Sequence, residues 1–499
     1  MNILKVQQVK EWDAFTIANE PISSTDLMER AAAKVVGWLL ENKASVPGYY
    51  IFCGRGNNGG DGLAIARLLL HTGEKVAVYV MHGLKQSPDF SVNFNRLGEL
   101  PVVINTISAV ADLPEVPAGA IIIEALFGTG LNRPLEGFAG EIVDCINGME
   151  NEVISIDMPA GLLADEPTNG THIIRAAHTL SFQSPRLALF FPENEIYTGQ
   201  WEVLNIGLHP SFEAASHLQW VLKDSPWLQL KKYRKHAHKG LLGHAMIAAG
   251  SKEKMGAAVM AAKACLSSGS GLLTMAVPED CFSIIQTVSP EAMCRPQDES
   301  ANEYFLQHAK INAVGIGPGW QEYEAQMALL EELIVTVKSP LVIDATALYH
   351  LSNNPSLLLL RPKGSETILT PHVGEFARLF GSSTNSFQRM QIAIEKAKAY
   401  NVFIVMKGAY TQVITPGGMS YFNSTGNAGM AKGGSGDVLT GIITSLLAQR
   451  YPATLACILG VYAHGLAGDI AAKKYSQQGM TALDIVRCLS KAWKLLQGE

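Results

Sequence analysis

Several features that mark particular classes of protein are missing from this sequence. Its seven cysteines are scattered and none belongs to a CxxC pair, so we expect neither a disulfide framework nor a thiolate zinc site. Charged residues make up only 17% of the chain and the formal net charge is −6, which argues against a nucleic-acid binder that depends on a basic surface. The first twenty residues contain no apolar core of the signal-peptide kind.

Long hydrophobic runs are equally scarce. The most apolar late stretch, "TLACILGVYAHGLAGDIAA", contains His464, Asp469 and many small residues. We interpret it as a buried helix, because a membrane span needs about twenty predominantly apolar residues. The sequence therefore predicts a soluble, cytoplasmic protein with no membrane or nucleic-acid partner.

What the sequence does contain is a repeated strand and helix pattern. With 499 residues, 47% of them hydrophobic, we expect at least two domains. Short apolar strands alternate with glycine turns and helical patterns, which indicates α/β structure with parallel sheets covered on both faces. The predicted strands are "YYIFCG", "KVAVYVM", "AIIIEALFG" and "EVISIDMPAG" in the first half, and "HAMIAAGS", "GLLTMAVP", "NAVGIGPG", "PLVIDATAL", "ETILTPH" and "VFIVMKG" in the second.

This rhythm is interrupted in the middle of the chain. Residues 207–240 contain prolines and the basic cluster "LKKYRKHAHKG", which we interpret either as a solvated linker or as a local basic surface. We place the domain boundary near 210–230, with one domain at 1–215 and another at 225–499.

The first candidate site begins at the strand that enters "IFCGRGNNGGDG". Its glycines would let the backbone approach a phosphate, and the following helix would offer unpaired N–H groups. Two further predicted strands end in the carboxylates Glu124 and Asp157. A tight turn that requires glycine is the alternative. Three such strand ends together favour a ligand crevice at the carboxyl edge of a sheet.

The motifs "GNNGGDG", "ALFGTGLNRP" and "IDMPAG" resemble those of the NAD(P)H-hydrate epimerase domain (the YjeF N-terminal family), over roughly the first 210 residues. The resemblance implies a Rossmann-like three-layer domain that interconverts the R and S forms of hydrated NADH and NADPH. It implies that Asp157 handles the proton, and that a potassium ion is bound by Asn58, Glu124 and Ala160. The family usually has aspartate at position 124 and serine at position 160. Substrate would lie against two loops. One consists of Asn57, Asn58, Gly59, Gly60 and Asp61, and the other consists of Gly128, Thr129, Gly130, Leu131, Asn132, Arg133 and Pro134.

The second candidate site is "NSTGNAGMAKGGSGDVLTG". Backbone N–H groups at the start of the following helix would form an anion cradle for a transferring phosphoryl group. Asp437, next to this cradle, would accept the proton of a substrate hydroxyl. Capping of the helix is the alternative role for Asp437, but capping does not explain the five glycines that precede it.

"GGSGD" before a helix resembles the ribokinase-like fold. Together with "HKGLLGHAMIAAGS", "GIGPG", "LTPHVGEFARL" and "VMKGAYT", it resembles the NAD(P)H-hydrate dehydratase domain from about residue 235 to the C-terminus. The resemblance implies that Ala257, Gly319, His372 and Asp437 contact the hydrated substrate. "DATAL" has Thr346 where the family commonly has a second aspartate, which leaves Asp344 without an assigned role. The nucleotide would be held by Lys407, Gly408, Ala409, Tyr410, Thr411 and Gly436.

Together the two resemblances imply a bifunctional repair enzyme. The C-terminal domain would phosphorylate the hydrate with ADP, release AMP and expel phosphate; the residues alone do not separate ADP from ATP. We also expect Mg²⁺ at this site and a homo-oligomeric assembly. The alternatives are a ribokinase-like small-molecule kinase with an accessory domain, and a nonenzymatic nucleotide sensor or scaffold.

Overall fold

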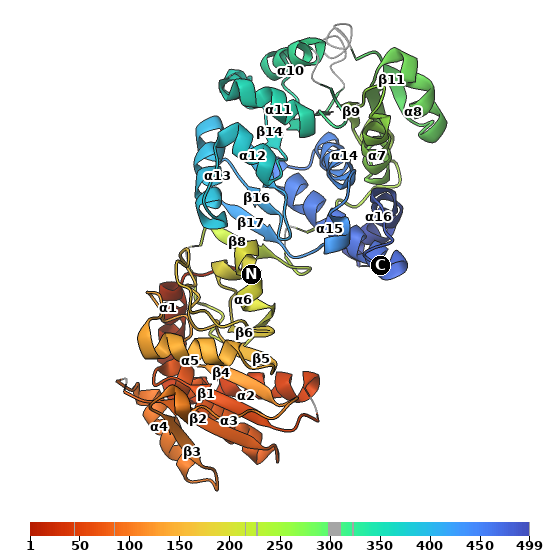
Figure 1. Ribbon diagram of the computed structural model, residues 1–499. Helices are drawn as coiled ribbons and strands as arrows, with labels where there is room; N and C mark the ends of the chain where they lie inside the picture. Colours follow the sequence, from red (N-terminus) through yellow and green to blue (C-terminus); the bar gives the residue numbers. More distant parts are fainter. Residues whose placement is uncertain are drawn as a thin grey trace. The chain divides into compact units, whose positions relative to one another are not determined.

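The computed structural model divides the chain into two compact units, one comprising residues 2–216 and the other residues 217–499 together with Met1. The structure describes residues 1–43, 45–83, 85–214, 216–225, 228–297, 311–321 and 324–498. Each unit is a layered α/β structure (Figure 1).

The N-terminal unit is built on one parallel sheet. Its helices are α1 (Val6–Asn19), α2 (Ser24–Asn42), α3 (Asn57–His71), α4 (Pro88–Gly98), α5 (Gly137–Asn147) and α6 (Glu195–Thr198). Its strands are β1 (Tyr49–Cys53), β2 (Val76–Met81), β3 (Ile104–Ile107), β4 (Ile121–Ala125), β5 (Val153–Ile156), β6 (His178–Phe182) and β7 (Gln200–Leu204). These strands lie in the order β3-β2-β1-β4-β5-β6-β7, and every pairing is parallel.

This order is that of the Rossmann fold, in which the chain reverses direction across the sheet between β1 and β4. Alternate strand residues face opposite layers, as expected for a buried sheet. Ile51 and Ile123 pack with α2, α3 and α4, whereas Phe52 and Ile122 pack with α5. The predicted Rossmann-like, three-layer architecture is confirmed.

Helix α3 starts earlier than the sequence analysis expected. Asn57–Asp61 was predicted as a loop, and that prediction is wrong: these residues form the first turn of α3. Two glycines allow this helix to lie very close to the sheet. A Cβ at Gly59 would lie 1.8 Å from the Gly54 carbonyl oxygen, and one at Gly62 would lie 2.7 Å from Cys53 Sγ. Part of the glycine cluster therefore serves helix–strand packing.

The C-terminal unit contains a larger, mixed sheet. Its helices are α7 (Met255–Ser267), α8 (Phe282–Val288), α10 (Glu324–Thr336), α11 (Ala345–Asn353), α12 (Val373–Phe380), α13 (Ser386–Tyr400), α14 (Ser435–Ala448), α15 (Ala453–Tyr475) and α16 (Ala482–Gln497). Its strands are β8 (Leu218–Val221), β9 (His244–Ala248), β10 (Leu272–Ala276), β11 (Met293–Arg295), β12 (Ala313–Ile316), β13 (Leu341–Ile343), β14 (Thr367–Leu369), β15 (Phe403–Met406), β16 (Gln412–Ile414) and β17 (Ser420–Asn423).

The strands of this unit lie in the order β11-β10-β9-β12-β13-β14-β15-β16-β17-β8. The pairings of β16 with β15 and β17 are antiparallel, and the others are parallel. Helices cover both faces: Ile247 packs with α7, α14, α15 and α16, whereas Met246 packs with α10 to α13 (Figure 1). The chain changes sides of the sheet between β9 and β12.

All ten strands predicted from apolar runs are present. Strand β8 was not predicted, because it lies in the stretch interpreted as a linker. It pairs with β17 at the edge of the C-terminal sheet. Strands β3, β6, β7, β11, β16 and β17 were also missed. Of these, β16 and β17 form a short meander rather than a strand followed by a helix.

The apolar helix near the C-terminus is a core element. Helix α15 is the one helix in the described ranges that is long and apolar enough to cross a membrane, but 72% of its most apolar window is buried within the protein. The prediction of a buried helix is confirmed. All seven cysteines are free, as the absence of a disulfide pattern predicted.

Candidate active sites

The N-terminal candidate site lies where β1, β4 and β5 end side by side. Gly54 follows β1, and Glu124 lies at the end of β4. Asp157 follows β5 directly. Because these strands are parallel neighbours, the three predicted strand ends meet at the carboxyl edge of the sheet. This edge includes the reversal point between β1 and β4, where open α/β sheets bind ligands.

Three of the predicted site residues converge at this edge. A Cβ at Gly128 would lie 3.1 Å from both the Asn58 side chain and Asp157 Oδ2, so Gly128 separates an amide from a carboxylate. The residues that follow, Gly130 and Asn132 to Pro134, are exposed. The loop after β4 therefore contacts Asn58 and Asp157 through Gly128 and presents its following residues to solvent.

Asp157 is held by donors on both of its oxygens. Its Oδ2 accepts hydrogen bonds from the Thr129 hydroxyl at 2.7 Å and from the Thr129 amide at 3.1 Å. Its Oδ1 lies 3.4 Å from Arg186 Nη2. The backbone of Asp157 adopts a positive φ of 65°, a strained conformation for a residue other than glycine, and such conformations cluster at functional sites.

Glu124 is fully buried beneath this site. Its carboxylate accepts hydrogen bonds from the Leu126 amide, the Ser155 hydroxyl and the Ala160 amide at 2.7–3.1 Å. Burial raises its pKa to about 7 despite these donors. None of the ion pairs formed by the described residues involves Glu124, so its ionised form has no cationic partner among them.

The sequence analysis missed two members of this cluster. Burial raises the pKa of Asp13, on α1, to about 6, against the opposing effect of Arg186. Arg186 itself is only 2% exposed. Asp61 was predicted, and burial, together with the charges of Asp157 and Asp13, raises its pKa well above the ordinary value. Neither Asp13 nor Arg186 stands in a glycine-rich motif at a strand end, so no local signal marked them.

The other two predicted residues of the first turn have different surroundings. Asn57 is exposed at the start of α3. Gly60 packs against the Met28 side chain: a Cβ at this position would lie only 2.8 Å from Met28 Sδ. The contacts of Gly59 and Gly60 are therefore packing contacts.

The C-terminal candidate site also lies at a reversal point, between β9 and β12. Gly319 follows β12 with a φ of +67°, and a Cβ at this position would lie 2.8 Å from the Ala257 Cβ and 3.3 Å from the Gly250 Cα. The structure thus brings together Ala257 and Gly319, two residues predicted to contact substrate. This place at the carboxyl ends of the strands is where open α/β sheets bind ligands.

Helix α14 begins beside this edge, and a cluster of charged side chains gathers at its first turn. Its N-cap, Gly434, has a φ of 95°, which favours glycine. A Cβ at Gly436 would lie 3.3 Å from Lys407 Nζ and 3.9 Å from Asp344 Oδ2. Lys407 follows β15, so the residues predicted to bind nucleotide from two distant motifs meet here.

Lys407 joins two carboxylates. Its ammonium lies 2.9 Å from Asp344 Oδ1 and 3.5 Å from Glu375 Oε2. Burial disfavours the charged form of Lys407, but the two carboxylates outweigh it and the pKa of Lys407 is raised. The second oxygen of Asp344 accepts a hydrogen bond from the Thr440 hydroxyl at 2.7 Å. Asp344, which had no assigned role, is therefore the centre of this network.

Asp437, in the first turn of α14, has the ionisation behaviour of a general base. Burial and the negative charge of Asp344 raise its pKa to about 7, while Lys407 opposes the shift. A carboxylate of this pKa is about half ionised at pH 7 and mostly ionised slightly above it, and it still accepts a proton readily. Asp437 is half-buried, so it is accessible to a substrate.

His372 caps a helix and remains open to solvent. Its Nδ1 accepts a hydrogen bond from the Gly374 amide at 3.0 Å, and its side chain is 60% exposed. Its amide donates to Glu375 Oε2 at 2.8 Å, so this residue is linked to the Lys407 network through Glu375. The Lys407 amide donates to the Pro371 carbonyl, which joins the two strand ends.

The rest of the predicted nucleotide loop forms an open turn after β15. The Thr411 hydroxyl donates to the Gly408 carbonyl at 3.0 Å, and Gly408 and Ala409 are exposed. Tyr410 is half-buried.

Glu375, Thr440 and His464 were missed in this site. Burial lowers the pKa of His464 to about 4, so it is neutral, and its Nε2 lies 3.3 Å from the Ser435 hydroxyl. Glu375 stands within the quoted motif "LTPHVGEFARL" and Thr440 within "GGSGDVLTG". Their positions three residues after His372 and Asp437 place them one helical turn further along, and this spacing is the signal that could have identified them.

The fold and both sites define the class of the protein: an α/β enzyme with a Rossmann-like unit and a ribokinase-like unit, each with an ionisable site at the carboxyl edge of its sheet. Comparison with solved structures supports the second assignment. An ADP/ATP-dependent NAD(P)H-hydrate dehydratase from Bacillus subtilis, co-crystallised with ATP and Mg²⁺, is 31% identical and matches 56% of this chain and 100% of its own, with a TM-score of 0.51. A ribokinase-like superfamily protein from Enterococcus faecalis is 26% identical and matches 58% of this chain and all of its own, also with a TM-score of 0.51.

Family models and relatives cover both units. Residues 24–188 match the family described as YjeF-related protein N-terminus, and residues 245–491 match NAD(P)H-hydrate dehydratase. A bifunctional NAD(P)H-hydrate repair enzyme from Moorella thermoacetica is 34% identical over 100% of this chain and 98% of its own. One from Escherichia coli is 31% identical over 89% of this chain and 84% of its own. The chain belongs to the family of bifunctional NAD(P)H-hydrate repair enzymes.

Proposed function

We propose that the N-terminal unit epimerises the R and S hydrates of NADH and NADPH, and that the C-terminal unit dehydrates the S form at the expense of ADP. The observation that carries the second assignment is the position of Asp437, a half-buried carboxylate with a pKa of about 7, beside Gly436 and Lys407 at the start of α14. The joining of the two units follows chemically, since the epimerase supplies the one epimer that the dehydratase accepts.

The dehydration divides into two steps. Asp437 takes the proton of the C6 hydroxyl of the substrate while the hydroxyl oxygen attacks the terminal phosphorus of ADP. The bond between this phosphorus and AMP then breaks. The amide N–H groups at the start of α14 stabilise the charge on the transferring phosphoryl group. Phosphate then leaves from C6 as the ring nitrogen supplies an electron pair, and loss of the neighbouring proton restores the reduced nicotinamide. Phosphorylation is needed because hydroxide is a poor leaving group.

The charged network around Asp344 positions the parts of this site. Lys407 is tied to Asp344 and Glu375, while Asp344 is tied to Thr440 of α14. The ammonium thus lies beside Gly436, where it can neutralise a phosphate oxygen. Mg²⁺, which was present with ATP in the B. subtilis crystals, would neutralise further phosphate charge when bound.

In the N-terminal unit, Asp157 handles the proton that moves during epimerisation. Thr129 and Arg186 hold its carboxylate in place beneath the opening lined by Gly128. Asn58 faces the same opening and supplies an amide for the hydrated ring or its phosphates.

The residues also fit a potassium ion. Asn58, Glu124 and the Ala160 carbonyl supply oxygen ligands, which a hard cation prefers. Glu124 is buried without a cationic partner, so a bound cation would offset the burial that raises its pKa. The Ala160 carbonyl also accepts a hydrogen bond from the Ile174 amide, and its second lone pair would be the ligand. The homo-oligomeric assembly in our proposal follows from the family resemblance, and the cytoplasmic location follows from the scattered cysteines without a disulfide pattern.

The experiment that tests this proposal uses full-length protein, ADP and the S hydrate of NADH. Asp437→Asn should lower the rate of dehydration at least about 10²-fold while ADP binding remains. Glu331→Gln, an exposed carboxylate change on α10, is the matched control and should leave the rate unchanged. Full turnover by Asp437→Asn would remove the assigned base, and phosphorylation of a vitamin or sugar in place of the hydrate would favour the kinase alternative.

A further inference from the structure

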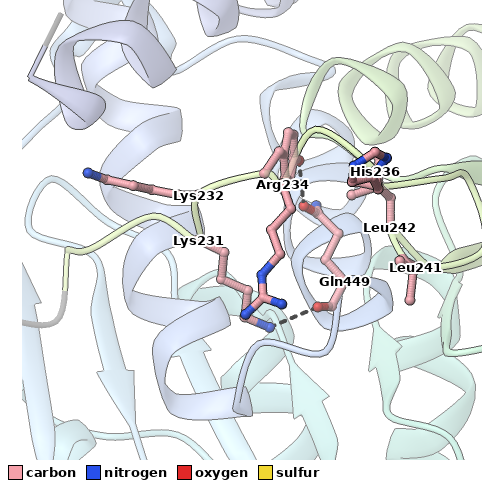
Figure 2. Close-up of a pocket in the computed structure, with 9 residues that line it drawn as sticks. Lys231, Lys232, Arg234, His236, Leu241, Leu242 and Gln449 are labelled. Carbon is pink, nitrogen blue, oxygen red and sulfur yellow. Dashed lines mark hydrogen bonds between the residues drawn. The ribbon is translucent and has the colours of Figure 1, made fainter.

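A pocket of about 370 Å³ lies in the C-terminal unit, in the basic segment that the proposed function leaves unused (Figure 2). It is lined by Lys231, Tyr233, Arg234 and His236, with the apolar side chains of Leu241 and Leu242. This volume is within the range of small-molecule sites. None of the described residues that line it is acidic, so its basic side chains have no counter-charge within the pocket.

Two of these cations lie close to the C-terminal end of α14. The Lys231 ammonium donates to the Gln449 carbonyl at 2.9 Å and to the Arg450 carbonyl at 2.7 Å. These two bonds use two of its three N–H groups, and the ammonium also lies over the Tyr451 ring, 4.4 Å from its centre. In Figure 2 the Arg234 side chain extends toward the same helix end. In the part of the chain that the structure describes, the Arg234 guanidinium has no hydrogen bond or ion pair.

The pocket also presents an aromatic ring and apolar surface. The Tyr233 hydroxyl donates to Gln449 Oε1 at 2.9 Å, and this bond fixes the ring at the pocket wall. Tyr233 is nevertheless 57% exposed and Leu241 is 55% exposed. A cationic end beside an exposed ring and leucine matches a ligand that joins phosphate to an aromatic base.

This pocket is separate from the candidate active site. Helix α14 has 14 residues and is therefore about 21 Å long. Asp437 lies in its first turn, whereas Gln449 lies just beyond its last residue. The pocket also precedes β9, at the amino edge of the strands, whereas the active site lies at their carboxyl edge.

We propose that this pocket is a second binding site for a nucleoside diphosphate, with phosphate between Lys231 and Arg234 and the base against Tyr233. The lysine is already anchored by the end of α14, so a bound phosphate would complete the charge arrangement without moving the helix. The site adds a nucleotide-binding function to the proposed activity and does not depend on the catalytic assignment.

The test is a calorimetric titration of the full-length protein with ADP. Wild-type protein and Lys363→Gln, a control that removes an exposed charge elsewhere, should bind two ADP molecules per chain. Arg234→Gln should weaken one of these binding events by about tenfold or more, because it removes a charged donor to phosphate. Tyr233→Leu should weaken the same event for ADP but leave pyrophosphate binding unchanged.

The difference between the titrations decides the outcome. Equal binding isotherms for wild-type and Arg234→Gln protein would overturn the proposal, as would a single ADP site in wild-type protein that Arg234→Gln leaves intact. Equal losses of ADP and pyrophosphate in Tyr233→Leu would overturn the assignment of a base to the ring. Hydrate turnover, measured in parallel, shows that each variant is folded and tests the proposed function separately.

Discussion

Replacing Asp437 by asparagine separates a catalytic base from a helix cap. Burial and the charge of Asp344 raise the pKa of Asp437 from 3.8 to about 7. Folded protein therefore holds a proton on this residue over a pH range in which the unfolded chain has lost it. This contribution to stability is fully present below pH 3.8 and is lost as the pH rises through 7. Asparagine has no such pH dependence.

The magnitude follows from the size of the shift. Between pH 5 and pH 7 the folded state binds about one more proton than the unfolded state, which changes stability by about 1.4 kcal/mol per pH unit. The contribution of Asp437 should thus fall by roughly 2–3 kcal/mol between pH 5 and pH 8, and by less in proportion to its partial exposure. Between pH 5 and pH 8, the difference in stability between Asp437→Asn and wild type should therefore shift by this amount in favour of the variant.

Differential scanning calorimetry of the full-length protein at both pH values measures this change. ADP should raise the transition of the C-terminal unit and so identify it. In a unit of this size, 2–3 kcal/mol corresponds to about 4–12 °C in Tm. If Asp437 is only a cap with an ordinary pKa, asparagine caps about as well and the stability difference between variant and wild type should not shift in favour of the variant between pH 5 and pH 8; that result would refute our reasoning.

Three further predictions concern the N-terminal unit. Asp157→Asn should lower epimer exchange at least about 10²-fold while S-hydrate dehydration continues, and unchanged exchange would contradict the role of Asp157. The potassium concentration needed for epimerisation should rise as the pH falls below 7, because protonation of Glu124 competes with the cation. Glu124→Gln should abolish this pH dependence. A potassium requirement that does not change with pH in wild-type protein would exclude Glu124 as a ligand. Gly59→Ala should destabilise the unit by more than about 3 kcal/mol in urea unfolding, since its Cβ would lie 1.8 Å from a carbonyl oxygen. Gly98→Ala, where no atom lies within 4 Å, is the control, and equal stability of the two variants would contradict the packing argument.

The sequence predicted those features that depend on local pattern. Apolar runs that end in glycine or a carboxylate identified β1, β4 and β5, and the parallel sheet then brought Glu124 and Asp157 to one edge. Strand β8 lacks such a run, and its place was determined by β17, which is about 200 residues away in the chain. Local composition could not reveal that pairing.

Contacts between side chains of different elements were equally hidden in the sequence. Arg186 approaches Asp157 after β6, and Asp344 approaches Lys407 across the sheet. The glycines near Asn57 gave a different difficulty. Their pattern suggested a ligand loop, but close packing of α3 on β1 also requires glycine at position 59. One residue type thus served two physical needs that sequence alone did not separate.

The most direct measurement follows the absorbance of the reduced nicotinamide after ADP is added to full-length protein with mixed R and S hydrates of NADH. Our account predicts complete recovery with wild-type protein, recovery limited to the S share with Asp157→Asn when spontaneous epimerisation is slow, and almost none with Asp437→Asn. Failure of the wild-type protein to restore any absorbance with ADP would contradict the central claim.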